Sequence, residues 1–200
     1  AVTITITDNE SAPTVTLSTA STSIDENSTD TITLTATLTN ATYQDVTVSI
    51  DGTGGTGTEG TDFGTVSDIT ISAGSATGTV TFDPTDDSVY EGNETAGISV
   101  SGVSGGSASE SGSQSVTITI TDNESAPTVT LTTSATSIAE NAGSSLTLTA
   151  TLSVATTADV TVSLGTSGTA TEGTDYTDGS GNIDDITISA GATTGTVSFT

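Results

Sequence analysis

The strongest constraint on the fold of this chain is the alternation of apolar residues with threonine or serine. A period of two places every apolar side chain of a run on one face of an extended strand. Threonine is β-branched and suits the opposite, solvent-facing side. About seven such strands in roughly 100 residues predict an all-β fold of the immunoglobulin-like, antiparallel β-sandwich type. The seven runs are Val15/Leu17, Ile32/Leu34/Ala36/Leu38, Val46/Val48/Ile50, Ile69/Ile71, Val80/Phe82, Ile98/Val100 and Val116/Ile118/Ile120.

An internal repeat shows that the sandwich occurs in tandem. The segment 2–17 recurs unchanged as 116–131, 114 residues later, and the six residues 58–63 return with one change as 171–176. Such self-similarity at a fixed spacing is typical of repeat arrays. We therefore expect three segments: 1–11 as the last strand of a preceding repeat, 12–124 as a complete sandwich, and 125–200 as an incomplete second sandwich lacking its last two strands.

Two further expectations follow from the repeat. The glycine-rich stretches 51–57 and 102–112 are predicted to be loops between strands. We expect the array to continue past both ends of this sequence. An alternative is strand exchange, in which residues 1–8 complete the open sandwich of a neighbouring molecule.

The charge of the chain excludes several classes of function. It has 25 acidic residues and no lysine, arginine or histidine, so no cationic patch exists for nucleic acid or for an anionic membrane surface. No apolar run approaches the roughly 20 residues that span a bilayer, so we expect no direct membrane insertion. Without cysteine or histidine, zinc, copper and haem sites are disfavoured, and the remaining oxygen ligands suit hard cations such as calcium.

Acidic residues fall at the ends of the predicted strands. Loops separated by an even number of strands emerge at the same end of an antiparallel sandwich, so we expect these acids to gather at one pole. With no basic residue to offset them, such a cluster favours a bound cation, although a solvated acidic rim remains the alternative. The acids are Asp25 and Glu26, Asp62, Asp86 and Asp87, Glu91 and Glu94, and Asp122 with Glu124.

Five motifs, in this order, resemble the Calx-beta repeats of the sodium/calcium exchanger regulatory domain and of many bacterial surface proteins. They are Ile24–Asn27, Thr58–Phe63, Ile71–Gly74, Asp86–Glu94 and Val116–Glu124. The resemblance implies a Calx-beta sandwich with Ca²⁺ as its cofactor. It implies ligands at Glu26, Asp62, Asp86, Asp87, Glu91, Glu94 and Asp122, the backbone carbonyl of Val89 as a further ligand, and Glu124 as an added acid. In the second repeat, Glu140 and Asp175 occupy the positions that match Glu26 and Asp62.

These observations favour a calcium-stabilised structural or adhesive repeat array of a secreted or cell-surface protein, with a filament or matrix subunit as one form of it. The expected partners are adjacent repeats of the same chain and identical chains in a filament or matrix. A calcium-sensing regulatory module is the alternative. An enzyme is not expected, because histidine, cysteine and lysine are absent. A carboxylate-based glycosidase, the one remaining catalytic class, would want more aromatic residues than the three Tyr and three Phe present.

Overall fold

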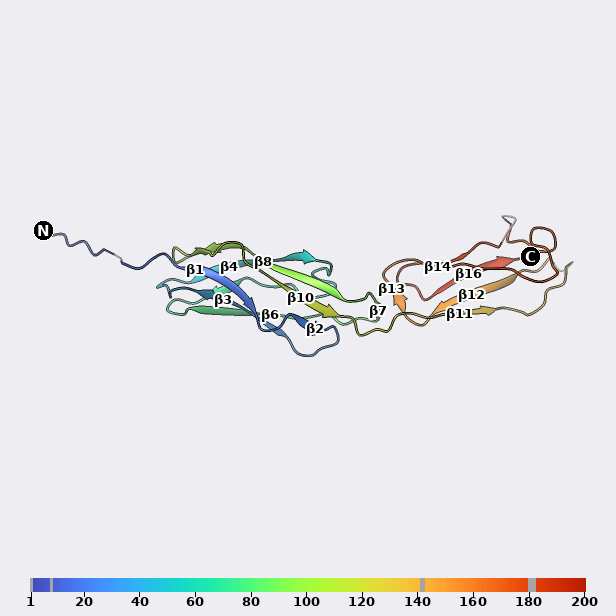
Figure 1. Cartoon of the computed structure of the whole chain (residues 1–200), viewed down its shortest axis with the longest axis horizontal. Helices are drawn as coiled ribbons and strands as arrows, with labels where there is room; N and C mark the ends of the chain where they lie inside the picture. Colours follow the sequence, from blue (N-terminus) through green and yellow to red (C-terminus); the bar gives the residue numbers. More distant parts are fainter. Residues whose placement is uncertain (1, 8, 141–142, 180–182) are drawn as a thin grey trace. The chain divides into compact units, whose positions relative to one another are not determined.

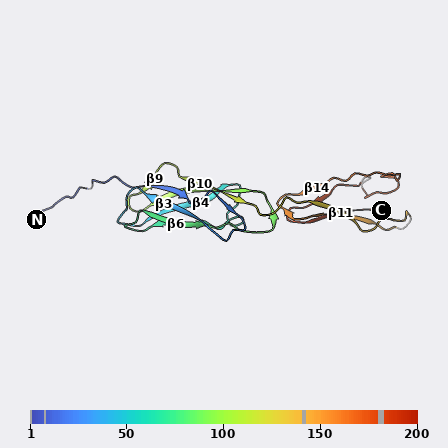
Figure 2. The ribbon, with the colours of Figure 1, turned by 60° about the horizontal axis from the view of Figure 1, so that its bottom comes forward.

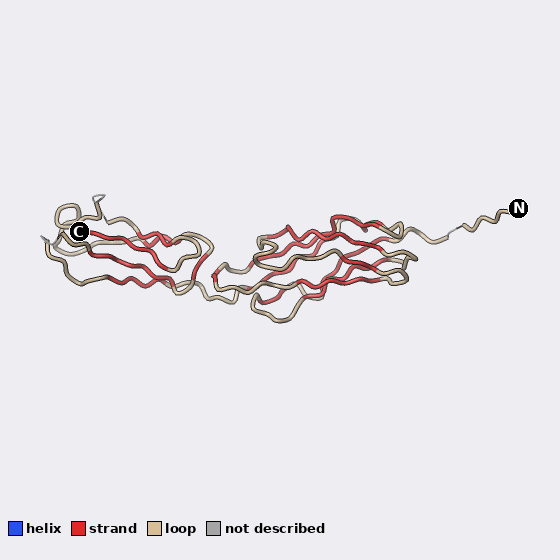
Figure 3. Tube along the Cα trace, turned by 180° about the vertical axis from the view of Figure 1, so that it is seen from behind, coloured by secondary structure: helices blue, strands red, loops and turns tan. Residues whose placement is uncertain are grey.

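The computed structural model describes residues 2–7, 9–140, 143–179 and 183–200, and these ranges contain strands and no helix (Figures 1 and 3). The all-β prediction is confirmed. The chain divides into two compact units, residues 1–87 with 93–122 and residues 88–92 with 123–200. Over the described residues, helices of the length and apolarity needed to cross a bilayer are absent.

The first sheet of unit 1 has the strand order β6, β3, β1, β9. Its long members are β1 (Thr14–Thr19), β3 (Ile32–Leu38) and β6 (Thr77–Phe82), all antiparallel, while the short β9 (Ser109–Glu110) pairs in parallel with β1. Figures 1 and 2 show β3 beside β6. Three of the seven predicted runs therefore build one face of the sandwich.

The second sheet of unit 1 has the strand order β2, β10, β8, β4, β5, and the last four of these strands contain the other four runs. The strands are β2 (Ser23–Asp25), β4 (Val46–Gly55), β5 (Ile69–Ile71), β8 (Glu94–Ser104) and β10 (Ser115–Thr121). All pairs are antiparallel except β2 with β10, which is parallel. Because β2 and β10 are parallel, their C-terminal ends lie side by side at the same end of the sheet.

The core of unit 1 lies between the two sheets. Inward residues of both sheets, such as Val15, Leu34 and Ile118, are fully buried. Phe63 joins them from a loop, and its ring centroid lies 5.1 Å from that of Phe82. The alternating burial along β3 matches the sequence pattern, because each second side chain of a strand points to the same face.

The two glycine-rich segments are not simply loops, so that prediction was wrong in part. β4 continues through Gly55 and β8 through Ser104, and β9 lies inside the second segment. The β4–β8 ladder contains register shifts, and a Cβ on Gly97 would lie 2.8 Å from the backbone carbonyl carbon of Gly54. Glycine is needed here because the two backbones approach more closely than any side chain allows.

Unit 2 repeats part of this plan. A three-stranded antiparallel sheet of β11 (Val129–Thr133), β12 (Leu146–Leu152) and β16 (Thr194–Phe199) corresponds to β1, β3 and β6. An antiparallel pair, β14 (Val160–Val162) and β15 (Ile186–Ile188), corresponds to β4 and β5. The short β7 (Val89–Tyr90) belongs to this unit and pairs in parallel with β13 (Ala155–Thr156).

Residues 2–7 form no strand, although the same six residues form most of β10 at 116–121. Val2, Ile4 and Ile6 are 92%, 83% and 91% exposed. The difference lies in the neighbours: β10 is flanked by β8 and β2, whereas none of the described strands pairs with residues 2–7. An alternating sequence becomes a strand only where a partner accepts its backbone hydrogen bonds.

Candidate metal centre

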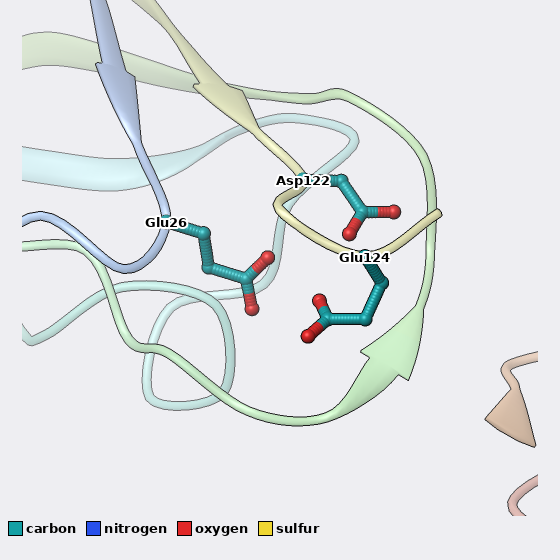
Figure 4. Close-up of side chains that lie close together, drawn as sticks. All are labelled: Glu26, Asp122 and Glu124. Atoms are coloured by element: carbon teal, nitrogen blue, oxygen red, sulfur yellow. The ribbon is translucent and has the colours of Figure 1, made fainter. Parts of the chain in front are cut away.

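The parallel pairing of β2 with β10 places three carboxylates together. Glu26 follows the end of β2, and Asp122 and Glu124 follow the end of β10. The Glu26 amide donates a 2.9 Å hydrogen bond to the Thr121 carbonyl, which fixes the two strand ends side by side. Oxygens of Glu26, Asp122 and Glu124 then lie within 4.8 Å of one another, and the side chains converge in Figure 4.

The loop after β6 reaches this first cluster. The Asp87 amide donates a 3.2 Å hydrogen bond to Oε1 of Glu26, across 61 residues of sequence. The Glu26 side chain is only 6% exposed, so its charge is largely removed from water. Asp86 and Asp87 themselves are exposed. The backbone of this loop at Asp87 therefore lies against Glu26, while the carboxylates of Asp86 and Asp87 belong to neither three-acid cluster.

A second cluster joins Asp62, Glu91 and Glu94. One oxygen from each of the three lies within 4.8 Å of the others. Asp62 is 9% exposed and precedes the buried Phe63, whereas Glu94 is the first residue of β8. Residues from two separate parts of the sequence, the turn at Asp62 and the segment 91–94, are thus gathered by the fold, as strand counting predicted.

Asn93 is a residue that the sequence reasoning missed. Its Oδ1 accepts a 3.3 Å hydrogen bond from the Asp122 amide. Asn93 is the neighbour of Glu94 in the second cluster, and Asp122 belongs to the first. An amide between acidic residues is the one signal in the sequence that could have identified it.

Both clusters suit a hard cation. Every member of the two clusters is a carboxylate, and the chain contains no lysine, arginine or histidine that could neutralise them. Two unit negative charges about 4 Å apart repel by roughly 4 kcal/mol at an effective dielectric constant near 20. A divalent cation bound by several oxygens removes this repulsion and converts it into attraction. The residues present therefore fit calcium better than a softer metal.

The remaining predicted ligands lie as follows. Val89 is in β7. Glu140 and Asp175 are exposed and line the same hollow of unit 2, with Tyr176 and Phe199. Six of the predicted residues thus form the two three-acid clusters, and Asp87 contacts the first through its amide. Their roles as metal ligands remain predictions.

Replacing Asn93 with alanine is expected to weaken divalent-metal affinity by about tenfold, since residues that orient metal ligands typically contribute 10–100-fold. The substitution removes the acceptor that holds the Asp122 amide. Isothermal titration calorimetry would measure the effect. Asn93→Asp keeps a side-chain acceptor and should retain most of the affinity, and Asn40→Ala, at an exposed loop position, should change nothing. Wild-type affinity in Asn93→Ala would contradict the positioning role.

Comparison with known proteins agrees with the family resemblance of the sequence motifs. The family model described as the Calx-beta domain matches residues 8–124 and 122–199. No match was found among curated proteins.

Solved structures similar to the chain include the apo form of the Calx CBD1 domain, with 19% identity and a TM-score of 0.48, covering 57% of this chain and 100% of that one. CBD12 from CALX1.2 shows 21% identity and a TM-score of 0.45, covering 88% and 71%. The calcium binding domain CBD12 of CALX1.1 shows 20% identity and a TM-score of 0.45, covering 88% and 70%. Because the family model matches twice and spans nearly the whole sequence, the chain belongs to the Calx-beta domain family.

Proposed function

We propose that this chain is a calcium-stabilised structural or adhesive repeat array of a secreted or cell-surface protein. The observation that carries the proposal is the presence of two three-carboxylate clusters in a chain without a single basic residue. The clusters join loops that are far apart in sequence, so an ion bound there holds the loops together. Calcium is the cation whose ligand preference matches these oxygen donors.

Each cluster would contribute a separate set of ligands. Glu26, Asp122 and Glu124 would hold one ion. Asp86 and Asp87 would add oxygens to the same ion, because the loop that carries them contacts Glu26. Asp62, Glu91 and Glu94 would hold another. Calcium takes six to eight oxygens, so bidentate carboxylates, backbone carbonyls such as that of Val89, and water would complete each shell.

A mechanical role is supported by the repetition of the sequence. Residues 2–17 recur without change as 116–131, and the three-stranded sheet of unit 2 repeats the order of the three antiparallel strands in the first sheet of unit 1. Near-identical tandem copies suit a structural repeat that extends a protein and displays it on a cell surface. In this function the chain would contact adjacent repeats of the same chain and identical chains in a filament or matrix.

The calcium concentration at half-saturation separates this function from a calcium sensor. Extracellular modules bind with dissociation constants of about 10⁻⁴–10⁻³ M, and sensors at about 10⁻⁷–10⁻⁵ M. We expect the weaker range for wild-type protein in isothermal titration calorimetry. Saturation at micromolar calcium would favour the regulatory alternative and count against the structural one.

Calcium is also expected to stiffen the junction after unit 1. Only Ser125, Ala126 and Pro127 separate Glu124 from Thr128, and Pro127 fixes its own backbone angle and biases Ala126 toward an extended conformation. An ion that orients Asp122 would therefore restrict the chain that follows. Small-angle scattering on several repeats in tandem should show a larger maximum dimension and a narrower range of shapes in calcium than in chelator.

The two scattering samples must have equal ionic strength, because a diffuse ion atmosphere lowers repulsion without fixing geometry. Glu26→Gln removes one ligand charge and should reduce the difference between calcium and chelator. Identical profiles in both conditions would show that packing alone sets the junction, with calcium acting only within one sandwich.

A further inference from the structure

Two apolar residues of β11 are exposed although their counterparts in unit 1 are buried. Val129 and Leu131 are 44% and 51% exposed, whereas Val15 and Leu17, in the identical segment of β1, are 0% and 7% exposed. In unit 1, β8 and β10 of the second sheet lie against β1. Among the described residues of unit 2, β14 and β15 correspond to β4 and β5, and no strand corresponds to β8 or β10 (Figure 1). The exposed face of β11 is therefore the face that β8 and β10 cover in unit 1.

The core of unit 2 is closed away from this face. Ile186 and Ile188 of β15 are buried, as are their counterparts Ile69 and Ile71 in β5. The strand β15 packs against β12 and β16 of the facing sheet. The exposure of β11 therefore marks a particular position in the sandwich and is not a general loosening of unit 2.

A strand edge lies beside the exposed face. In unit 1, Ser23–Asp25 forms β2, whose only partner is β10, and Ile24 packs against the core. The equivalent residues 137–139 form no strand, and Ile138 is 37% exposed. Unit 2 thus offers both an apolar face and a backbone edge to a segment in the position of β10.

Residues 2–7 have the sequence of the strand that takes this position in unit 1. They are identical to 116–121, the last six residues of β10. In β10, Ile118 and Ile120 are buried, whereas their counterparts Ile4 and Ile6 are largely exposed. The chain therefore contains an exposed apolar segment and an exposed apolar face whose sequences are in contact with each other in unit 1. Segments of this kind bind by adding a strand to an open sheet.

We propose that residues 2–7 of one molecule bind unit 2 of a second copy of this chain, in the position that β10 occupies in unit 1. Ile4 and Ile6 would cover Val129 and Leu131 of the second copy. The position of β8 stays open, so we expect the association to be reversible. This contact goes beyond the calcium function proposed above, because it involves no metal ion.

The pairing of β2 with β10 fixes the register of the proposed contact. Thr119 lies opposite Ser23, and Ile120 lies opposite Ile24, in a parallel pair. Thr5 of one molecule should therefore lie opposite Ser137 of the next. The binding segment and the binding face are different surfaces, so each molecule can bind one neighbour through each of them. Such a contact forms open chains when its rotation does not close a ring.

Sedimentation velocity of the full chain in chelator tests the contact, at about 0.15 M salt, where screening limits repulsion between the acidic molecules. We expect a series of oligomers that grows with protein concentration. Ile4→Ser and Leu131→Ser should each weaken association by about tenfold or more, because each removes a large apolar side chain from the contact. Leu131 is half exposed, so Leu131→Ser should keep the melting temperature of the wild type.

A mixture of the two variants provides the sharpest result. Ile4→Ser retains the binding face, and Leu131→Ser retains the binding segment, so an equal mixture should form heterodimers and nothing larger. Each variant alone should stay monomeric at the same concentration. Tyr43→Ser removes an exposed aromatic side chain outside the contact and should associate as the wild type does.

Disulfide formation tests the register, since the chain contains no cysteine. Neighbouring strands lie about 4.8 Å apart, within the range of about 4.4–6.8 Å between the Cα atoms of a disulfide. A Thr5→Cys protein mixed with a Ser137→Cys protein should form a covalent dimer under mild oxidation. Thr3→Cys, two residues out of register, should react more slowly with Ser137→Cys. The double variant Ser23→Cys/Thr119→Cys calibrates the reaction within unit 1.

The outcomes separate this inference from the calcium function. A wild-type chain that stays monomeric at every concentration would overturn the inference, and so would association that Ile4→Ser and Leu131→Ser leave unchanged. Association that requires calcium and ignores both substitutions would indicate ion bridging between acidic surfaces, which also overturns it. Association in chelator that both substitutions weaken would support the inference, even in a protein that binds no calcium.

Discussion

Calcium at 10 mM is expected to raise the free energy of unfolding by about 2.7 kcal/mol for each site that binds with a dissociation constant of about 0.1 mM. The gain arises because the folded chain gathers carboxylates that the unfolded chain keeps apart. For a chain of this size it corresponds to a rise in melting temperature of about 5–10 °C per site. Thermal unfolding in calcium and in chelator, at matched ionic strength, would measure it.

Single substitutions test whether the named acids cause this effect. Asp87→Asn should reproduce part of the effect of chelator, because it removes a charge from the loop that contacts Glu26. Glu10→Gln removes one exposed charge outside both clusters and should leave the calcium response unchanged. A melting temperature that stays the same after exhaustive chelation of the wild-type protein would refute calcium stabilisation.

Phe63→Ala is expected to lower the free energy of unfolding by about 3–5 kcal/mol, the usual range for removing a buried phenylalanine. Phe63 is fully buried and packs against Phe82, so alanine would leave a cavity in the core. Denaturant unfolding in chelator would measure the loss without any contribution from calcium. Tyr43→Ala is the control: Tyr43 is 89% exposed, and its removal should change stability by no more than about 0.5 kcal/mol.

The same substitution should affect the second metal cluster, because Phe63 holds the turn that carries Asp62. Calcium affinity at the cluster of Asp62, Glu91 and Glu94 should fall in any Phe63→Ala protein that remains folded, whereas a Phe63→Leu protein should keep most of it. A stability change in Phe63→Ala as small as that in Tyr43→Ala would contradict the role of Phe63 as the core anchor of this turn.

The sequence by itself determined which segments become the main strands. Each alternating run, from Val15/Leu17 to Val116/Ile118/Ile120, lies within an observed strand with its apolar residues facing inward or partly buried. This succeeded because the period of two is a local property of the extended backbone, independent of which strand becomes the neighbour. Parity of the strand order also predicted that distant acids would lie at the same end.

Tertiary structure alone decided the finer arrangement. It divided the acids into two clusters of three, brought in Asn93 through one hydrogen bond, and used Asp62 to close its own turn. It added the short strands β2, β7 and β9, which carry no alternating pattern long enough to detect. These features depend on distances between segments that are remote in sequence, and a local pattern holds no information on such distances.

The clearest case is one stretch of sequence that occurs twice with two outcomes. Residues 116–121 belong to β10, between β8 and β2, whereas the identical residues 2–7 are exposed and form no strand. Alternation made both segments able to form a strand. Only β10 has neighbouring strands that share backbone hydrogen bonds with it and an opposite sheet that covers its apolar face, and both come from residues that are distant in the sequence.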